Sequence, residues 1–140
     1  MDLRQINEDI TVSPQIDCED IAAIAEAGYR AILCNRPDGE EAGQCDYAPL
    51  EEAAKEAGLE VRFVPIIPGQ ISREDVEAFQ LALDELPKPL LAYCRTGTRC
   101  AKMWSVTQFG QIPAEDILQA TSKAGYDMTG LLMQLQQQSR

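Results

Sequence analysis

The run from Leu90 to Cys100 most strongly constrains how this chain can fold. Its first four residues are apolar and indicate a buried strand that stops at Cys94. A short loop containing Gly97 follows, and a helix is expected to begin near Arg99. A strand, a tight loop and a helix in this order place the cysteine in front of the N-terminus of a helix. The sequence therefore predicts an α/β arrangement centred on this loop.

The surroundings predicted for Cys94 should lower the pKa of its thiol. A helix N-terminus offers unpaired N–H groups and partial positive charge, and two guanidiniums flank the sulfur. The same N–H groups and Arg99 can bind an oxyanion. We therefore predict a nucleophilic thiolate beneath an anion-binding loop, the alternative being an inert cysteine buried at a strand end. The further anion-binding residues that we predict are Arg95, Thr96, Gly97 and Thr98.

Composition limits the classes of function that the chain can have. The net charge of -11, without a run of Lys or Arg, argues against a nucleic-acid or anionic-membrane surface. No stretch has the pattern of a signal peptide or a membrane span, so we expect a cytoplasmic protein with one domain over 1–140. Basic residues in the loop should then favour a small anion that can enter a local positive site.

Histidine is absent, which excludes Ser-His-Asp, Cys-His and His-ligated metal chemistry. The cysteines are odd in number and form no C-x-x-C pair, so a disulfide framework or a zinc site is not expected. No metal and no organic cofactor is implied. Cys34 lies in a predicted strand and is assigned to the core, and nothing marks Cys45 as reactive.

Strand and helix patterns alternate along the chain, which predicts a three-layer α/β fold. We expect a mostly parallel central sheet of about four or five strands with helices on both faces. The strands are predicted within 3–12 and at 29–34, 60–65 and 90–93. The helices are predicted from Asp17 to Gly28, from Pro49 to Ala57, from Ser72 to Leu86, from Arg99, from Pro113 to Gly125 and from Thr129 to Gln138.

The loop after the strand at 29–34 offers a second group of candidate site residues. Open α/β sheets place binding groups at the carboxyl ends of their strands, so Arg36 and Asp38 can lie in the same crevice as Cys94. A solvated turn with a local pair between Arg36 and Asp38 explains the pattern equally well.

Four segments together match the pattern of a known family, and these are Ile10–Gln15, Asn35–Glu40, Pro87–Pro89 and Ala92–Arg99. Through them the chain resembles the bacterial beta-lactamase-hydrolase-like family, described as phosphatase-like or as sulfurtransferases. It also resembles the dual-specificity branch of the protein tyrosine phosphatases, which implies a cysteine phosphatase-like fold. In such families the loop cysteine is the nucleophile and the loop arginine binds the substrate anion, which implies these roles for Cys94 and Arg99.

Two departures from the phosphatase pattern favour sulfur transfer. Only four residues separate Cys94 from Arg99, as in the C-x-x-G-x-R loop of rhodanese-type sulfurtransferases, whereas phosphatases have five. Phosphatases also place an acidic residue in the loop that here spans 66–70 and contains no carboxylate. Asp38 and Asp75 remain as candidate acids, although Asp75 has the spacing of a helix capping box.

Three functions remain open at this stage. The first is a sulfurtransferase that carries a persulfide on Cys94, with a small oxyanion or persulfide as substrate and a thiol as acceptor. The second is a tyrosine or dual-specificity-like phosphatase that forms a phosphocysteine. The third is a non-catalytic redox or anion sensor in which Cys100 resolves Cys94 as a disulfide, the alternative being that Cys100 only packs. The amphipathic segment 129–138 leaves a homodimer and intramolecular packing equally open.

Overall fold

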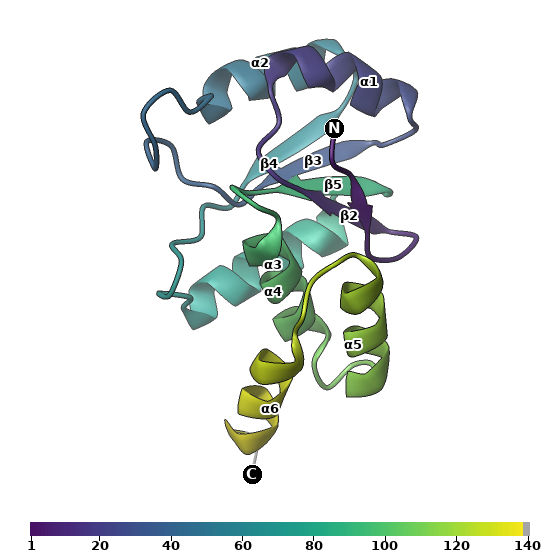
Figure 1. The fold of residues 1–140 in the computed structure, drawn as a ribbon. Helices are drawn as coiled ribbons and strands as arrows, with labels where there is room; N and C mark the ends of the chain where they lie inside the picture. The colour runs from purple at the N-terminus through teal and green to yellow at the C-terminus, as the bar shows by residue number, and fades with distance from the viewer. Residues whose placement is uncertain (139–140) are drawn as a thin grey trace.

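A five-stranded sheet forms the centre of the computed structural model, which describes residues 1–138 (Figure 1). Its strands lie in the order β1-β2-β5-β3-β4, and all neighbours run parallel except β1, which is antiparallel to β2. This confirms the predicted, mostly parallel sheet of an α/β fold. The strands are β1 (Arg4–Gln5), β2 (Ile10–Ser13), β3 (Ala31–Cys34), β4 (Glu60–Phe63) and β5 (Leu90–Tyr93).

Helices cover both faces of the sheet (Figure 1). The 3-10 helix η1, α1 and α2 lie on one face, and α3 and α4 lie on the other. The last two helices, α5 and α6, contact α4 on its outer side. The bounds are η1 (Cys18–Asp20), α1 (Ile21–Glu26), α2 (Tyr47–Glu56), α3 (Arg73–Glu85), α4 (Thr98–Gln108), α5 (Ala114–Lys123) and α6 (Thr129–Gln138).

Strand β5 lies in the middle of the sheet between β2 and β3, and all four of its residues are buried. Successive side chains of a strand point to opposite faces. Leu90 and Ala92 therefore pack in the core beneath α3 and α4, while Leu91 and Tyr93 pack beneath α1 and α2. An apolar run without alternation is what a strand covered on both faces requires. The central position of β5 fixes the start of the cysteine loop within the core.

Several predicted element boundaries differ from the structure by one or two residues. The strand predicted at 29–34 begins at Ala31, and the strand predicted at 60–65 ends at Phe63. The helix predicted from Pro49 begins at Tyr47, because proline is tolerated in the first turn, where N–H groups have no intrahelical partner. The helix predicted near Arg99 begins at Thr98. No helix within the described residues is both long enough and apolar enough to cross a membrane.

Candidate active site

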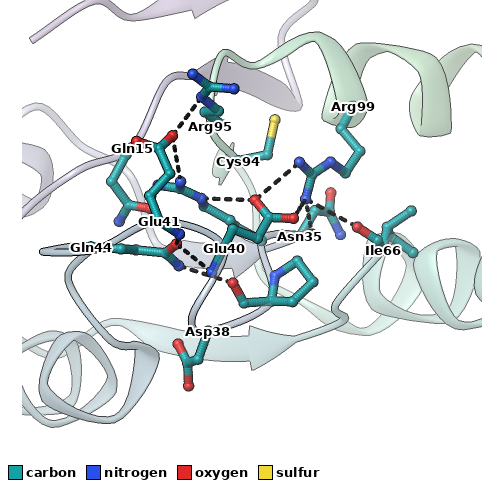
Figure 2. A network of polar contacts seen from close by, with 12 residues as sticks. Gln15, Asn35, Asp38, Glu40, Glu41, Gln44, Ile66, Cys94, Arg95 and Arg99 are labelled. Carbon is teal, nitrogen blue, oxygen red and sulfur yellow. Dashed lines mark hydrogen bonds and ion pairs between the residues drawn. The ribbon is translucent and has the colours of Figure 1, made fainter. Parts of the chain in front are cut away.

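The carboxyl ends of four parallel strands meet at one edge of the sheet, and each is followed by a residue of the candidate site (Figure 2). Gln15 follows β2, Arg36 follows β3, Ile66 follows β4 and Cys94 follows β5. Residues far apart in sequence become neighbours here because parallel strands end on the same side of a sheet. The loop after β3 thus lies beside the cysteine loop and is joined to it by the ion pairs of Glu40 and Glu41 with Arg99 and Arg95. The described residues that line the cavity beside Cys94 include none from the loop after β3.

The thiol of Cys94 has a pKa below its ordinary value, although the residue is buried. Its side chain is only 1% exposed, and the backbone N–H of Gly97 donates to Sγ at 3.1 Å. The thiol of Cys100 donates the hydrogen bond that lowers the pKa of Cys94 most. Burial opposes ionisation, but backbone N–H groups of Cys100, Thr96 and Gly97 add to the lowering, so that the pKa is about 6. Cys94 is therefore mainly a thiolate at neutral pH.

Cys100 lies in the first turn of α4 and is fully buried. Burial raises its pKa well above the ordinary range, and the neighbouring Cys94 thiol raises it further. Cys100 therefore stays protonated and acts as a donor to the Cys94 sulfur. Cys100 packs in the core beside Cys94, and both thiols are free, so its role as a resolving thiol stays a prediction.

Arg99 points to the edge of the sheet from the first turn of α4 (Figure 2). Its guanidinium binds both carboxylate oxygens of Glu40, at 3.0 and 3.2 Å. It also donates to the backbone carbonyls of Asn35 at 3.3 Å and Ile66 at 3.0 Å. A planar guanidinium with this many fixed acceptors has a defined orientation.

Arg36 is buried, with only 4% of its surface exposed. Two carboxylates balance its charge, and an amide oxygen accepts a further hydrogen bond. Nε donates to Glu40 at 2.9 Å, and the two terminal nitrogens donate to Gln15 and Glu41, each at 3.0 Å. Glu41 in turn pairs with Arg95 at 2.6 Å, and the side chain of Arg95 is 64% exposed. Three arginines thus share two carboxylates, which leaves the network with an excess of one positive charge.

Glu40 is ionised in this network. Burial raises its pKa, but hydrogen bonds from Arg99 and Arg36 and the charges of both outweigh that effect and lower the pKa below its ordinary value. A carboxylate held in this way binds its proton too weakly to act as a proton donor near neutral pH.

Asp38 is not part of the Cys94 crevice, which corrects one of the predictions. Its carboxylate accepts a hydrogen bond from the backbone N–H of Tyr47, at 2.8 Å, and so satisfies a free N–H group at the start of α2. Figure 2 shows the side chain directed away from Cys94 and Arg99. Of the two residues predicted in this loop, Arg36 therefore joins the network and Asp38 does not.

A cavity of about 230 Å³ opens beside Cys94. The described residues that line it include three basic side chains and two hydroxyls, but no Asp or Glu. Asp75, the other candidate acid, forms the predicted capping box with Ser72 at the start of α3. Within residues 1–138 no group of three or more Cys, Asp or Glu side chains could hold a metal ion. The cavity is lined by Pro68, Gly69, Ile71, Cys94, Arg95, Thr96, Thr98, Arg99 and Lys102.

Sequence reasoning missed four residues that shape the site. Glu40, Glu41 and Gln15 hold the arginines, and Lys102 lines the cavity. Glu40 and Gln15 follow strand ends, so the rule that located Arg36 could also have located them. Lys102 lies four residues after Thr98 on α4, which places both on one face of the helix.

Residues 2–111 match the family described as "Beta-lactamase hydrolase-like protein, phosphatase-like domain". A "Beta-lactamase hydrolase-like protein" of Xylella fastidiosa is 30% identical over 141 residues, which cover 99% of this chain and 33% of that protein. The chain therefore spans about a third of the length of this relative.

Solved structures agree with the family match. A candidate phosphatase of Neisseria meningitidis superimposes with a TM-score of 0.85 at 33% identity, over 96% of each chain. The active form of Tk-PTP superimposes with a TM-score of 0.67 at 15% identity, over 98% of this chain and 95% of that one, and shares the fold. The fold is thus that of the cysteine phosphatases, and the chain belongs to the beta-lactamase hydrolase-like, phosphatase-like domain family.

Proposed function

We propose that this protein is a sulfurtransferase that moves sulfane sulfur through a persulfide on Cys94. The observation that carries the proposal is a Cys94 thiol with a pKa of about 6 beside a cavity whose lining side chains are basic, hydroxylic or apolar. A thiolate supplies the nucleophile, and the positive lining attracts an anionic sulfur donor. The coarser conclusion, a phosphatase-like family with a cysteine nucleophile, follows from the family match itself.

The reaction needs no proton donor on the leaving group. The Cys94 thiolate attacks the outer sulfur of thiosulfate, the S–S bond breaks, and sulfite leaves with the bonding electron pair. The new persulfide on Cys94 then meets a thiolate acceptor, which takes the outer sulfur and returns Cys94 to its thiolate form. Sulfite is a stable anion that leaves without taking up a proton, so the reaction needs no proton donor from Glu40, Asp38 or Asp75, whose carboxylates are engaged elsewhere.

The basic side chains around the cavity can hold the oxygens of the donor. Arg99 is oriented by Glu40, while Lys102 makes no ion pair among the described residues and is exposed at the cavity. The N–H groups at the start of α4 add partial positive charge next to the sulfur. A small oxyanion or a persulfide is the class of donor that fits such a site, and a low-molecular-weight or protein thiol is the acceptor.

A phosphatase that forms a phosphocysteine is the second candidate, and the solved structures favour it over sulfur transfer. Phosphoryl transfer to Cys94 would expel an alkoxide or a phenoxide, which normally takes a proton from an acid. Glu40 is ionised, and Asp38 and Asp75 are engaged at the starts of helices. A phosphatase with this site would therefore cleave esters with good leaving groups and show a steep dependence on the pKa of the leaving group.

Paired turnover assays separate the two functions. Transfer of sulfur from thiosulfate to a thiol and release of phosphate from aryl phosphates would be measured on wild type, Cys94→Ser and the control Cys45→Ser. We expect sulfur transfer that is lost in Cys94→Ser and retained in Cys45→Ser. Phosphate release that depends on Cys94, without sulfur transfer, would refute the proposal. If neither activity is detected, the protein is better described as a redox or anion sensor, and the sulfurtransferase proposal is refuted in that case as well.

A further inference from the structure

Tyr126 reaches the cysteine loop from the opposite end of the sequence. It lies in the segment that joins α5 to α6, and only 8% of its surface is exposed. Its hydroxyl donates a hydrogen bond to the backbone carbonyl of Thr96 at 3.1 Å. Thr96 belongs to the loop between Cys94 and α4, so a residue outside the predicted site contacts the backbone of that loop directly.

This hydrogen bond falls on the same peptide unit that contacts the reactive sulfur. The carbonyl of Thr96 and the N–H of Gly97 are the two ends of one planar peptide group. Tyr126 donates to the carbonyl end, and the N–H end donates to Cys94 Sγ at 3.1 Å. Hydrogen bonds in such a chain polarise one another, so a donor at the carbonyl strengthens the N–H as a donor.

The packing of Gly97 shows how closely Tyr126 approaches the loop. A Cβ at this position would lie 2.1 Å from the Tyr126 hydroxyl oxygen and 3.1 Å from its Cζ. Gly97 also has a φ of 89°, a conformation that other residues rarely adopt. Only glycine therefore allows the hydroxyl to reach the Thr96 carbonyl.

Tyr126 is itself held in place. The guanidinium of Arg4 lies 5.4 Å from the centre of its ring and donates to the carbonyl of Ala124 at 3.1 Å. Burial raises the pKa of Tyr126 to about 12, against the opposing charge of Arg4 and with smaller contributions from Cys94, Cys100 and Asp2. The hydroxyl thus remains protonated and available as a donor over the whole range in which Cys94 titrates.

We propose that Tyr126 is a positioning residue for Cys94, which fixes the Thr96–Gly97 peptide so that its N–H points at the sulfur and stabilises the thiolate. The effect passes through the backbone and not through contact with substrate. This role of Tyr126 requires Cys94 to be the reacting group, as in the proposed function. It is the same whether Cys94 transfers sulfur or a phosphoryl group. Its failure can therefore be told apart from failure of the proposed function.

The test is the pH dependence of Cys94 alkylation in the full chain, measured by peptide mapping for wild type and Tyr126→Phe. This substitution keeps the ring against Arg4 and removes only the hydroxyl. We expect the midpoint of the alkylation curve to move up by a few tenths of a pH unit and by no more than about one unit, which is the shift that complete loss of a hydrogen bond to the sulfur would produce. Tyr29→Phe is the matched control, because Tyr29 donates to Thr11 at 2.9 Å, outside the cysteine loop.

A second readout separates positioning from general stability. The amide proton of Gly97 should move upfield in the NMR spectrum of Tyr126→Phe, because its hydrogen bond to sulfur weakens. An unchanged alkylation midpoint together with an unchanged Gly97 resonance would overturn the proposal. A lower melting temperature with both readouts unchanged would overturn it as well, since Tyr126 would then be only structural.

Discussion

Glu40 binds the Arg99 guanidinium with both of its carboxylate oxygens, at 3.0 and 3.2 Å, across a separation of 59 residues in sequence. One of these oxygens also accepts from Arg36 at 2.9 Å. A single carboxylate therefore joins the loop after β3 to the first turn of α4. The orientation of Arg99 depends on this pair, since the rest of its fixed partners are backbone carbonyls.

Replacing Glu40 with Gln should destabilise the protein by about 1–3 kcal/mol, because two largely buried guanidiniums lose their shared carboxylate. The measurement is urea unfolding. Glu41→Gln is the control and should cost less than about 1 kcal/mol, since exposed ion pairs contribute little and Glu41 is 48% exposed. Equal effects of the two substitutions would contradict the special role of Glu40.

The ion pair of Glu40 with Arg99 should make the free energy of unfolding depend on pH in the acid range. The folded-state pKa of Glu40 is lowered, so its contribution is complete above the ordinary pKa of a glutamate and is lost as the pH falls through the lowered value. The free energy of unfolding of wild type should therefore fall more steeply below about pH 4.5 than that of Glu40→Gln. If the free energy of unfolding falls equally steeply with decreasing pH in wild type and in Glu40→Gln, the pKa of Glu40 is not lowered by folding.

Cys94 should react as a thiolate well below the pH at which ordinary thiols do. We expect its alkylation rate in the folded protein to reach half of its plateau at a pH of about 6. In denatured chain the midpoint should return to the range of a free cysteine, about 8.5. Peptide mapping distinguishes Cys94 from the exposed Cys18. A folded midpoint at the denatured value would remove the basis for a nucleophilic role.

Cys100 should contribute to this acidity, because its thiol supplies the largest lowering of the Cys94 pKa. Cys100→Ala should raise the alkylation midpoint of Cys94 by about one pH unit, whereas Cys100→Ser, which keeps a donor, should stay closer to wild type. If both variants titrate like wild type, the contact between the two sulfurs does not stabilise the thiolate.

Asp38 should matter for the stability of α2 and not for catalysis. Asp38→Ala removes an acceptor for the Tyr47 N–H and should lower the free energy of unfolding by about 1 kcal/mol. Turnover per folded molecule and its pH profile should not change. Loss of the basic limb of a phosphatase profile in this variant would instead identify Asp38 as a general acid.

Local patterns were sufficient to predict the parts of the fold and site that depend on neighbouring residues. The buried strand Leu90–Tyr93, the capping box of Ser72 and Asp75 and the helix Thr129–Gln138 follow from apolar runs and cap spacing. The cysteine loop follows from the same kind of reasoning, because strand, glycine and helix start lie within eleven residues.

Contacts that depend on tertiary structure could not be predicted in the same way. The sequence suggests a local pair of Arg36 with Asp38, whereas the path of the loop brings Glu40 and Glu41 to the guanidinium instead. Asp38 accepts from the N–H of Tyr47. Tyr126 reaches Thr96 across 30 residues, through the packing of the last two helices, and no local pattern marks that contact.

The most direct test of the central claim is the intact mass of the protein after brief incubation with thiosulfate, beside a Cys94→Ser control. We predict that wild type gains the mass of one sulfur atom at Cys94, that a thiol such as dithiothreitol removes it, and that Cys94→Ser gains nothing. If wild type gains no sulfur while Cys94 still forms a phosphocysteine with an aryl phosphate, sulfur transfer is contradicted and the protein is a phosphatase.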